Sequence, residues 1–172
     1  MKTFETDEIK LIPLTEAQVV VFNKEPEKII ADLGVNNKTL FNPDVLQEIN
    51  DKVVLPRLRA ATAEEAVFHT RWLAVDKATN QVVAELMVKQ GPDATGAIEI
   101  GYGVYPEFAG QGWMTKIVAA FLQWAKQHPK VKLVWAETAK DNLSSIRVLE
   151  KNGFAKFREN SLFYYWRVSI EK

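Results

Sequence analysis

The sequence contains no cysteine, which excludes disulfide bonds, thiolate metal ligands and a cysteine nucleophile. It has only two histidines, His69 and His128, and neither is accompanied by acidic residues at the spacing of a metal site or a catalytic triad. No stretch is apolar for long enough to cross a membrane, and the charged start MKTFETDEIK lacks the apolar segment of a signal peptide. We therefore expect a cytoplasmic protein with no metal and no membrane partner.

An excess of one charge is also absent, because 22 Lys and Arg residues balance 22 Asp and Glu residues. A balanced chain has no general attraction for nucleic acid, so we expect no nucleic-acid partner. The 172 residues suit one domain with a single sizeable core, and no linker, repeat or low-complexity tract divides them. We predict one domain over residues 1–172.

Helical and strand-like periods alternate along the chain. A short strand precedes helices within residues 15–54, and a run of three strands, then helix, strand, helix and two strands follow. Thr15 and Gln18 have the spacing of a capping box, Gly34 is expected to end the second helix, and Asn42 is expected to cap the third. The third helix has one apolar face, formed by Val45, Leu46, Ile49 and Val53, and residues 113–126 form one apolar stripe. The expected strands lie at 10–15, 68–76, 81–89, 97–105, 131–138, 154–159 and 162–169, and the later helices at 113–126 and 142–153. This order predicts an α+β fold, with a mostly antiparallel mixed sheet flanked by helices. One right-handed parallel crossover is expected between Ile98 and Thr138.

The strand AIEIGYGVY has one face with almost no side chains. Its even-numbered residues, from Ile98 to Val104, are apolar or aromatic and predict the core face. The opposite face carries Glu99, Gly101 and Gly103. Glycine weakens a strand interior, so glycines on that face indicate either a bulge or the close approach of a ligand to the backbone.

The turn AGQGWMT directly precedes a helix and contains Gly110 and Gly112. Such a turn leaves several main-chain N–H groups unpaired and pointing one way, which suits an anion and above all a phosphate. The alternative is that these glycines only make a tight connection. The motif GxxxxGK[ST] is absent and no GxGxxG lies at the turn, which disfavours a nucleoside triphosphatase or a dinucleotide dehydrogenase.

Two blocks around these residues resemble the GNAT superfamily of N-acetyltransferases, and within it the ribosomal-protein-alanine (RimJ/RimL) type. The blocks are EIGYGVYPEFAGQGWMTKIVAAFLQWA and AETAKDNLSSIRVLEKNGFAKF, in that order. With the strand that connects them they cover roughly residues 97 to 158, and the preceding strands match in layout. The resemblance implies a GNAT-like fold and an acetyl-CoA-dependent enzyme.

The resemblance also implies residues that hold acetyl-CoA. Main-chain groups of Val104 and Tyr105 would hold the pantetheine arm, and Asn142 would bind the same arm from the other side. Asn142 also has a structural explanation as a helix N-cap. The pyrophosphate would be held by N–H groups of Gly110, Gln111, Gly112, Met114 and Thr115.

The sequence departs from the superfamily pattern at three positions. Ala109 stands where Arg or Gln usually opens the loop, Met114 where a small residue closes it, and Leu149 where many members have a tyrosine as general acid. Loss of an arginine would remove one phosphate contact but leave the backbone donors. Ser145 stands where some N-terminal acetyltransferases of this type have a serine, and it would hydrogen-bond the departing thiolate, unless it is an ordinary residue of the first helical turn.

The implied reaction is direct attack of a primary amine on the thioester in a ternary complex. An α-amino group with a pKa of about 8 is partly neutral at pH 7, whereas a lysine near 10.4 is roughly a thousandfold less so. Glu99 is the candidate base, although it is also placed to be a cross-strand partner of Arg71 or a lysine.

The acceptor remains open at this level. We favour a protein or peptide N-terminus. A small-molecule amine acetyltransferase would need acidic residues at the acceptor mouth, which TAEE or NPDVLQEIND would supply. A non-catalytic acyl-CoA-binding module is the other alternative, motivated by Ala109 and Leu149. The chain is expected to be a monomer or a homodimer.

Overall fold

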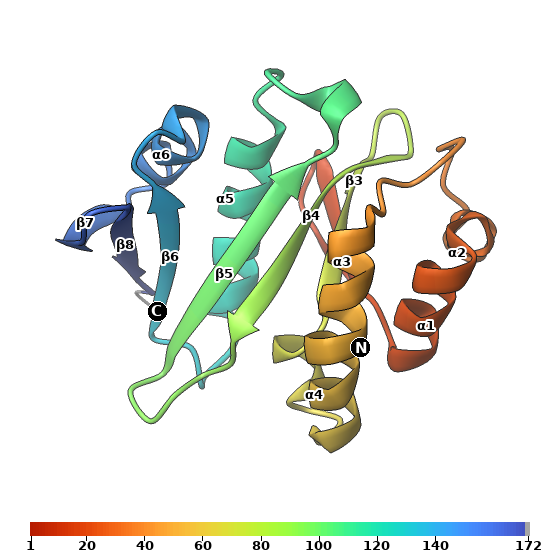
Figure 1. Cartoon of the computed structure of the whole chain (residues 1–172), viewed down its shortest axis with the longest axis horizontal. Coiled ribbons are helices and arrows are strands. Elements are labelled where there is room, and N and C mark those ends of the chain that lie inside the picture. Colours follow the sequence, from red (N-terminus) through yellow and green to blue (C-terminus); the bar gives the residue numbers. More distant parts are fainter. Residues whose placement is uncertain (171–172) are drawn as a thin grey trace.

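The computed structural model of the chain describes residues 1–170 and contains one twisted sheet with helices on both faces (Figure 1). The strands are β1 (Phe4–Glu5), β2 (Ile9–Pro13), β3 (Arg71–Asp76), β4 (Gln81–Gln90), β5 (Ala97–Val104), β6 (Leu133–Ala139), β7 (Ala155–Glu159) and β8 (Phe163–Ser169). They form the order β1-β2-β3-β4-β5-β6-β8-β7. Neighbours run antiparallel except β5 and β6, which are parallel, so the predicted mixed sheet with one parallel crossover is confirmed.

One face of the sheet is covered by α5 (Trp113–Lys126) and α6 (Leu143–Lys151). The apolar stripe predicted for α5 is buried here, because Ile117 and Phe121 are fully buried and Trp124 is nearly so. Trp72 of β3 packs edge-on against Phe121 and Trp124, with ring centroids 5.8 and 4.8 Å apart. Burying each such side chain contributes about 1.5–3 kcal/mol, so this cluster holds the C-terminal half of α5 against the sheet.

The opposite face is covered by α1 (Glu16–Lys24), α2 (Pro26–Leu33) and a longer irregular helix. Thr15 and Gln18 form the predicted capping box of α1, and Gly34 ends α2 in the left-handed conformation, with φ of 63°. Phe22 of α1 and Ile29 of α2 are fully buried in a second core on this face of the sheet. The irregular helix consists of α3 (Asp44–Ile49), the π-helical segment η1 (Asn50–Val54) and α4 (Leu55–Ala60).

The irregular helix differs from its prediction in two ways. It begins after Pro43, whereas Asn42, whose amide was expected to cap it, donates a 2.9 Å hydrogen bond to the carbonyl of Phe22. It also continues beyond residue 54, because Pro56 lies in the first turn of α4, where a missing N–H is tolerated. The result is one irregular helix over residues 44–60 that lies over the sheet (Figure 1).

The parallel strands separate soon after they meet. β5 and β6 pair only at Ala97 with Leu133, Ile98 with Val134 and Glu99 with Trp135. Beyond Glu99, within the described residues 1–170, the end of β5 pairs with β4 alone, at register positions up to Val104 with Ala84. The C-terminal part of β5, which carries the glycines, is therefore open on its β6 side.

Smaller differences from the sequence prediction lie at element ends. β3 begins at Arg71 because residues Ala66–Phe68 form a 3-10 turn, and a second 3-10 turn, Pro106–Phe108, follows β5. The two-residue strand β1 was not predicted, since two residues carry no readable period. α5 and α6 have the expected positions.

Candidate active site

Two cavities meet at the end of β5. Tyr102, Gly103 and Val104 line both of them. The first, which we name the α5 cavity, has a volume of about 380 Å³ and is bounded by the start of α5 and by α6. The second, named the α3 cavity, has a volume of about 620 Å³ and lies between the irregular helix and strands β3 to β5. Groups held in the two cavities can therefore meet beside Gly103.

Glycine makes this meeting point open. A Cβ atom added at Gly103 would meet no atom within 4 Å, so the space over this residue is free. At Gly101 an added Cβ would come within 3.0 Å of the Lys89 side chain, which lies across that residue. The face of β5 that the sequence predicted to be bare therefore borders open space at Gly103 and the Lys89 side chain at Gly101.

The turn before α5 has the geometry of an anion site. Gly110 and Gly112 have φ of 75° and 82°, in the left-handed region where a side chain is strained, and both line the α5 cavity. Within residues 1–170 the amides of Gly110, Gln111 and Gly112 donate no hydrogen bond, and no side chain caps α5. Met114 and Thr115, in the first helical turn, also line the cavity. The loop therefore presents free N–H groups together with the positive end of the helix dipole.

Helix α6 supplies the other wall of the α5 cavity. Asn142 caps this helix, with its Oδ1 accepting from the amide of Ser145 at 3.1 Å, so the structural explanation for Asn142 holds. Its Nδ2 has no hydrogen-bond partner within residues 1–170, and the residue lines the cavity, so a ligand contact is compatible with capping. Two cationic residues one helical turn apart, Arg147 and Lys151, line the same wall.

Tyr102 and Ser145 join the two walls. The Tyr102 hydroxyl lies 2.8 Å from the Ser145 Oγ, across the gap where β5 and β6 have separated. Burial raises the pKa of Tyr102 to about 12, while its hydrogen bond to Ser145 acts in the opposite direction. The phenol is therefore protonated at neutral pH and able to donate to the serine.

The sequence analysis missed Tyr102 as a functional residue. It placed this side chain on the core face of β5, and that face is correct, since Tyr102 packs against the α5 core. The early separation of β6 makes this part of the core face a cavity wall, and strand alternation alone contains no such information. Leu149 of α6 is fully buried, whereas Tyr102 of β5 lines the α5 cavity.

Three of the predicted site residues line neither cavity. Tyr105 uses its amide in a 2.9 Å hydrogen bond to the Val83 carbonyl, and its side chain is buried in the second core. Gln111 has its side chain folded onto its own loop, where its Nε2 donates a 3.2 Å hydrogen bond to the Glu107 carbonyl. Glu99 forms an ion pair with Lys89, the cross-strand lysine partner that the sequence allowed.

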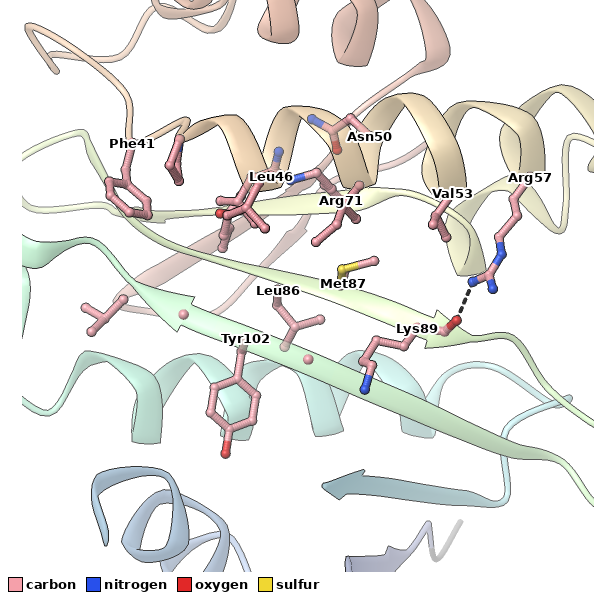
Figure 2. Close-up of a pocket in the computed structure, with 17 residues that line it drawn as sticks. Phe41, Leu46, Asn50, Val53, Arg57, Arg71, Leu86, Met87, Lys89 and Tyr102 are labelled. Carbon is pink, nitrogen blue, oxygen red and sulfur yellow. Dashed lines mark hydrogen bonds and ion pairs between the residues drawn. The ribbon is translucent and has the colours of Figure 1, made fainter. Parts of the chain in front are cut away.

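The α3 cavity has mainly apolar walls (Figure 2). Leu46, Ile49 and Val53 project from the irregular helix, and Leu86 and Met87 from β4. These helix residues were predicted to form one apolar face, and the structure leaves that face toward a cavity. Arg57 of α4 donates a hydrogen bond to the Lys89 carbonyl, which joins the helix to β4 at one end of the cavity (Figure 2).

A buried ion pair lies in the wall of the α3 cavity. Arg71 of β3 binds Glu85 of β4, with side chains only 4% and 12% exposed. Arg71 also lies over the Phe22 ring, 4.8 Å from its centroid. Burial lowers the pKa of Arg71 to about 10, which still leaves it charged at neutral pH. Glu85 pairs in register with Gly103, so its carboxylate lies next to the meeting point of the two cavities.

In residues 1–170 there is no group of three or more His, Cys, Asp or Glu side chains arranged to hold a metal ion. Among the helices of the same residues, none is both long and apolar enough to cross a membrane.

The fold and this site define a GNAT acetyltransferase. A family profile described as "Acetyltransferase (GNAT) domain" matches residues 15–155, so the chain belongs to that family. A curated relative from Bacillus subtilis (strain 168), "Uncharacterized N-acetyltransferase YjdG", is 25% identical over 172 residues, covering 96% of this chain and 97% of the relative. The family and the acetyl-CoA-dependent acetyltransferase class predicted from the sequence are confirmed.

Solved structures show the same fold at low sequence identity. A RimL ribosomal L7/L12 alpha-N-protein acetyltransferase in complex with coenzyme A has a TM-score of 0.67 and 16% identity, covering 98% of both chains. A ribosomal-protein-S5-alanine acetyltransferase from Vibrio fischeri has a TM-score of 0.69 and 15% identity, covering 99% of this chain and 98% of the other.

Proposed function

We propose that this acetyltransferase moves an acetyl group from acetyl-CoA to a primary amine, with a peptide or protein N-terminus as the favoured acceptor. The observation that carries the proposal is the meeting of two cavities at Tyr102, Gly103 and Val104. One cavity has a phosphate-type loop and the other is apolar, so the donor and the acceptor would bind on opposite sides of β5. Direct attack in a ternary complex follows from this arrangement.

The residues around the α5 cavity fit coenzyme A. We assign the pyrophosphate to the free amides of the loop from Gly110 to Gly112 and of the first turn of α5 at Met114 and Thr115. Arg147 and Lys151 would add two positive charges on the facing wall, where Ala109 offers none. Val104 and Asn142, which line the cavity from β5 and α6, would flank the pantetheine arm. Bound acetyl-CoA supplies the activated acyl group.

A base must come within hydrogen-bond reach of the attacking amine. Glu85 lines the α3 cavity and lies opposite Gly103, whereas Glu99 is engaged by Lys89 and lines neither cavity. This position favours Glu85 over Glu99 as the base that we propose. Its ion pair with Arg71 holds the carboxylate in place beside Gly103. An α-amino group with a pKa of about 8 is already partly neutral at pH 7, so it depends less on a base than a lysine would.

The departing thiolate needs a hydrogen-bond donor. Ser145 lies at the wall of the α5 cavity, and its hydroxyl is 2.8 Å from the protonated Tyr102 hydroxyl. We propose that Ser145 donates to the thiolate while Tyr102 donates to Ser145, so the two hydroxyls act as one unit. The amide of Val104 is the candidate donor to the thioester carbonyl as charge develops on its oxygen.

A polyamine acceptor is disfavoured by the charges around the α3 cavity. Its lining includes three cationic side chains, Arg57, Arg71 and Lys89, and one carboxylate, Glu85. The acidic residues of TAEE and NPDVLQEIND, which a polyamine would need, are not among the lining residues. A small uncharged or acidic amine remains the second candidate.

The test is a thiol-release assay with acetyl-CoA and a panel of acceptors that contains short peptides, alkylamines and spermidine. We expect peptides with free N-termini to release coenzyme A at the highest rate and spermidine at the lowest. Calorimetric binding of coenzyme A is measured in parallel, since binding without thiol release for any amine would overturn the catalytic assignment. Preference for spermidine would overturn the assignment of the acceptor.

A further inference from the structure

One positive charge in the wall of the α3 cavity has no counter-charge. The charged side chains that line this cavity are Arg57, Arg71, Glu85 and Lys89. Arg71 pairs with Glu85, and Lys89 pairs with Glu99 of β5. Arg57 forms no ion pair within residues 1–170, and its hydrogen bond goes to an uncharged group, the main-chain carbonyl of Lys89. The cavity therefore carries one uncompensated positive charge, that of Arg57.

Arg57 lies at the end of the cavity away from Gly103. Figure 2 shows its guanidinium beside the Lys89 carbonyl, where the irregular helix meets the end of β4. The register of β4 and β5 places Lys89 between the positions opposite Ile100 and Glu99, which come three and four residues before Gly103. At the rise of a β-strand this separation is about 10–13 Å. A group bound by Arg57 is therefore well separated from the meeting point of the two cavities.

The guanidinium of Arg57 suits a carboxylate. It has five N–H donors in a rigid fork, of which the bond to the Lys89 carbonyl uses one. Arg57 is exposed, so its other donors are open to a ligand. A carboxylate carries one negative charge and would balance the charge of Arg57. A phosphate monoester carries about two and would leave one unbalanced.

Apolar walls lie between Arg57 and the meeting point. Val53 of η1 and Met87 of β4 line this stretch, on the side of Arg57 that leads toward Tyr102 (Figure 2). The cavity volume of about 620 Å³ leaves room for an extended chain. A ligand that fits this cavity has an apolar middle and a carboxylate at one end.

We infer that the α3 cavity selects amine acceptors that carry a carboxylate about 10 Å from the attacking nitrogen, with the carboxylate on Arg57 and an apolar spacer against Val53 and Met87. The inference rests on the proposed function, since the amine must lie beside Gly103 for transfer. It adds charge and length as the properties that select the acceptor. Two sources share this chemistry: an acidic side chain at the third residue of an extended peptide, and a small ω-amino acid.

The test compares two ligands that differ in charge alone. N-acetyl-8-aminooctanoate and N-acetyl-8-aminooctanamide are acetylated products with the same hydrocarbon chain, and only the first is charged. Eight bonds join the nitrogen to the carboxyl carbon and span about 9 Å, because three chain bonds span about 3.3–3.6 Å. Each ligand is titrated by calorimetry into protein saturated with coenzyme A. We expect the carboxylate to bind about 5- to 12-fold more tightly, the range between an exposed ion pair and a hydrogen bond to a charged group.

A shorter pair of ligands tests the length. In N-acetyl-4-aminobutanoate and N-acetyl-4-aminobutanamide, four bonds span about 5 Å. The carboxylate of this pair falls short of Arg57 while its nitrogen lies beside Gly103, so we expect the two affinities to agree within about twofold. The same preference for the carboxylate in both pairs would show a general attraction for anions and would overturn the inference.

The variant Arg57→Gln removes the charge but keeps an N–H donor for the Lys89 carbonyl. The matched control is Arg59→Gln on the same helix, α4, which removes an exposed arginine that pairs with Glu16 and lies outside the cavity lining. We expect Arg57→Gln to reduce the preference for the longer carboxylate to within about twofold and the control to retain it. An unchanged preference in Arg57→Gln protein would overturn the assignment of the carboxylate to Arg57.

Thiol release with two peptides distinguishes the two sources. Ala-Leu-Glu amide and Ala-Leu-Gln amide differ only in the charge of the third side chain. A kcat/KM about 5- to 12-fold higher for the Glu peptide would assign the carboxylate to a polypeptide acceptor. Equal values for the peptides, together with a preference for the longer acetylated carboxylate, would assign it to a small ω-amino acid.

The outcomes also separate this inference from the proposed function. Failure to bind coenzyme A, or no thiol release with any amine, would overturn the proposed function itself. Normal coenzyme A binding with equal affinity for the two longer ligands, or with no measurable binding of either, would overturn this inference and leave the donor site intact. If Arg57→Gln protein does not fold, the comparison of the longer and shorter pairs on the unaltered protein decides the matter.

Discussion

Substitution of Gly112 by valine separates the fold from the donor site. Gly112 precedes α5 with φ of 82°, and a Cβ atom added there would meet no atom within 4 Å. The cost to the fold is therefore the backbone conformation alone, which is about 1–2 kcal/mol for a residue with a side chain. In a protein of this size that cost lowers Tm by about 2–8 °C. The protein should remain folded at room temperature.

The cost to coenzyme A binding should be much larger. The loop amides can point at one anion only while Gly112 keeps its left-handed conformation, and the valine side chain would extend into the α5 cavity. Each hydrogen bond lost to a charged phosphate costs about 1.5–3 kcal/mol, which is roughly a 10- to 150-fold loss of affinity. We expect Gly112→Val to raise the Kd for coenzyme A at least about 100-fold, because more than one contact is affected.

Gly34→Val is the matched control. Gly34 also has a left-handed φ, 63°, and open space at its Cβ position, but it ends α2 and lines neither cavity. Both variants should lose similar thermal stability by differential scanning calorimetry, while only Gly112→Val loses affinity by isothermal titration. Retention of coenzyme A affinity within about threefold in folded Gly112→Val protein would refute the assignment of the loop.

Three further predictions concern single groups. Tyr102→Phe and Ser145→Ala should each slow turnover about 100-fold with little change in coenzyme A affinity, and the double variant should be no slower than either, since the two hydroxyls act as one unit; additive losses would contradict the unit. Glu85→Gln should lower kcat/KM most at low pH, where the amine is hardest to deprotonate, whereas a larger effect of Glu99→Gln would restore Glu99 as the base. Burial lowers the pKa of His128 below its usual value, so the unfolded state binds more protons near pH 6 and stability should fall between about pH 7 and pH 5.5. Urea unfolding of His128→Asn protein should show a smaller fall of the free energy of unfolding over this pH range. An unchanged dependence of that free energy on pH would assign the effect to other groups.

Much of the fold could be predicted from local patterns in the sequence. The capping box at Thr15, the glycine that ends α2 and the period of α5 each depend on neighbouring residues, so the sequence contains the whole signal. The family resemblance also depended on two continuous blocks, and the turn at Gly110 and Gly112 directly precedes α5, as the sequence predicted. These features required no knowledge of which distant segments meet.

The acceptor side could not be predicted in the same way, because it depends on contacts between distant segments. Arg71 and Glu85 come from β3 and β4, and Asn50 comes from a π-helical segment that no period in the sequence indicates. The partner of Glu99 was one of several allowed, and only the strand register selected Lys89.

By itself, the sequence determined the order of elements, the loop that opens α5 and the family, since each is written in residues close along the chain. The tertiary structure decided where β5 and β6 separate. That separation leaves a cavity beside Tyr102 and allows its hydroxyl to reach Ser145. It also decided that the apolar face of α3 remains open to a cavity. The physical reason is that the period of apolar residues along the chain specifies which side chains face inward, whereas the packing of distant elements specifies what those side chains contact.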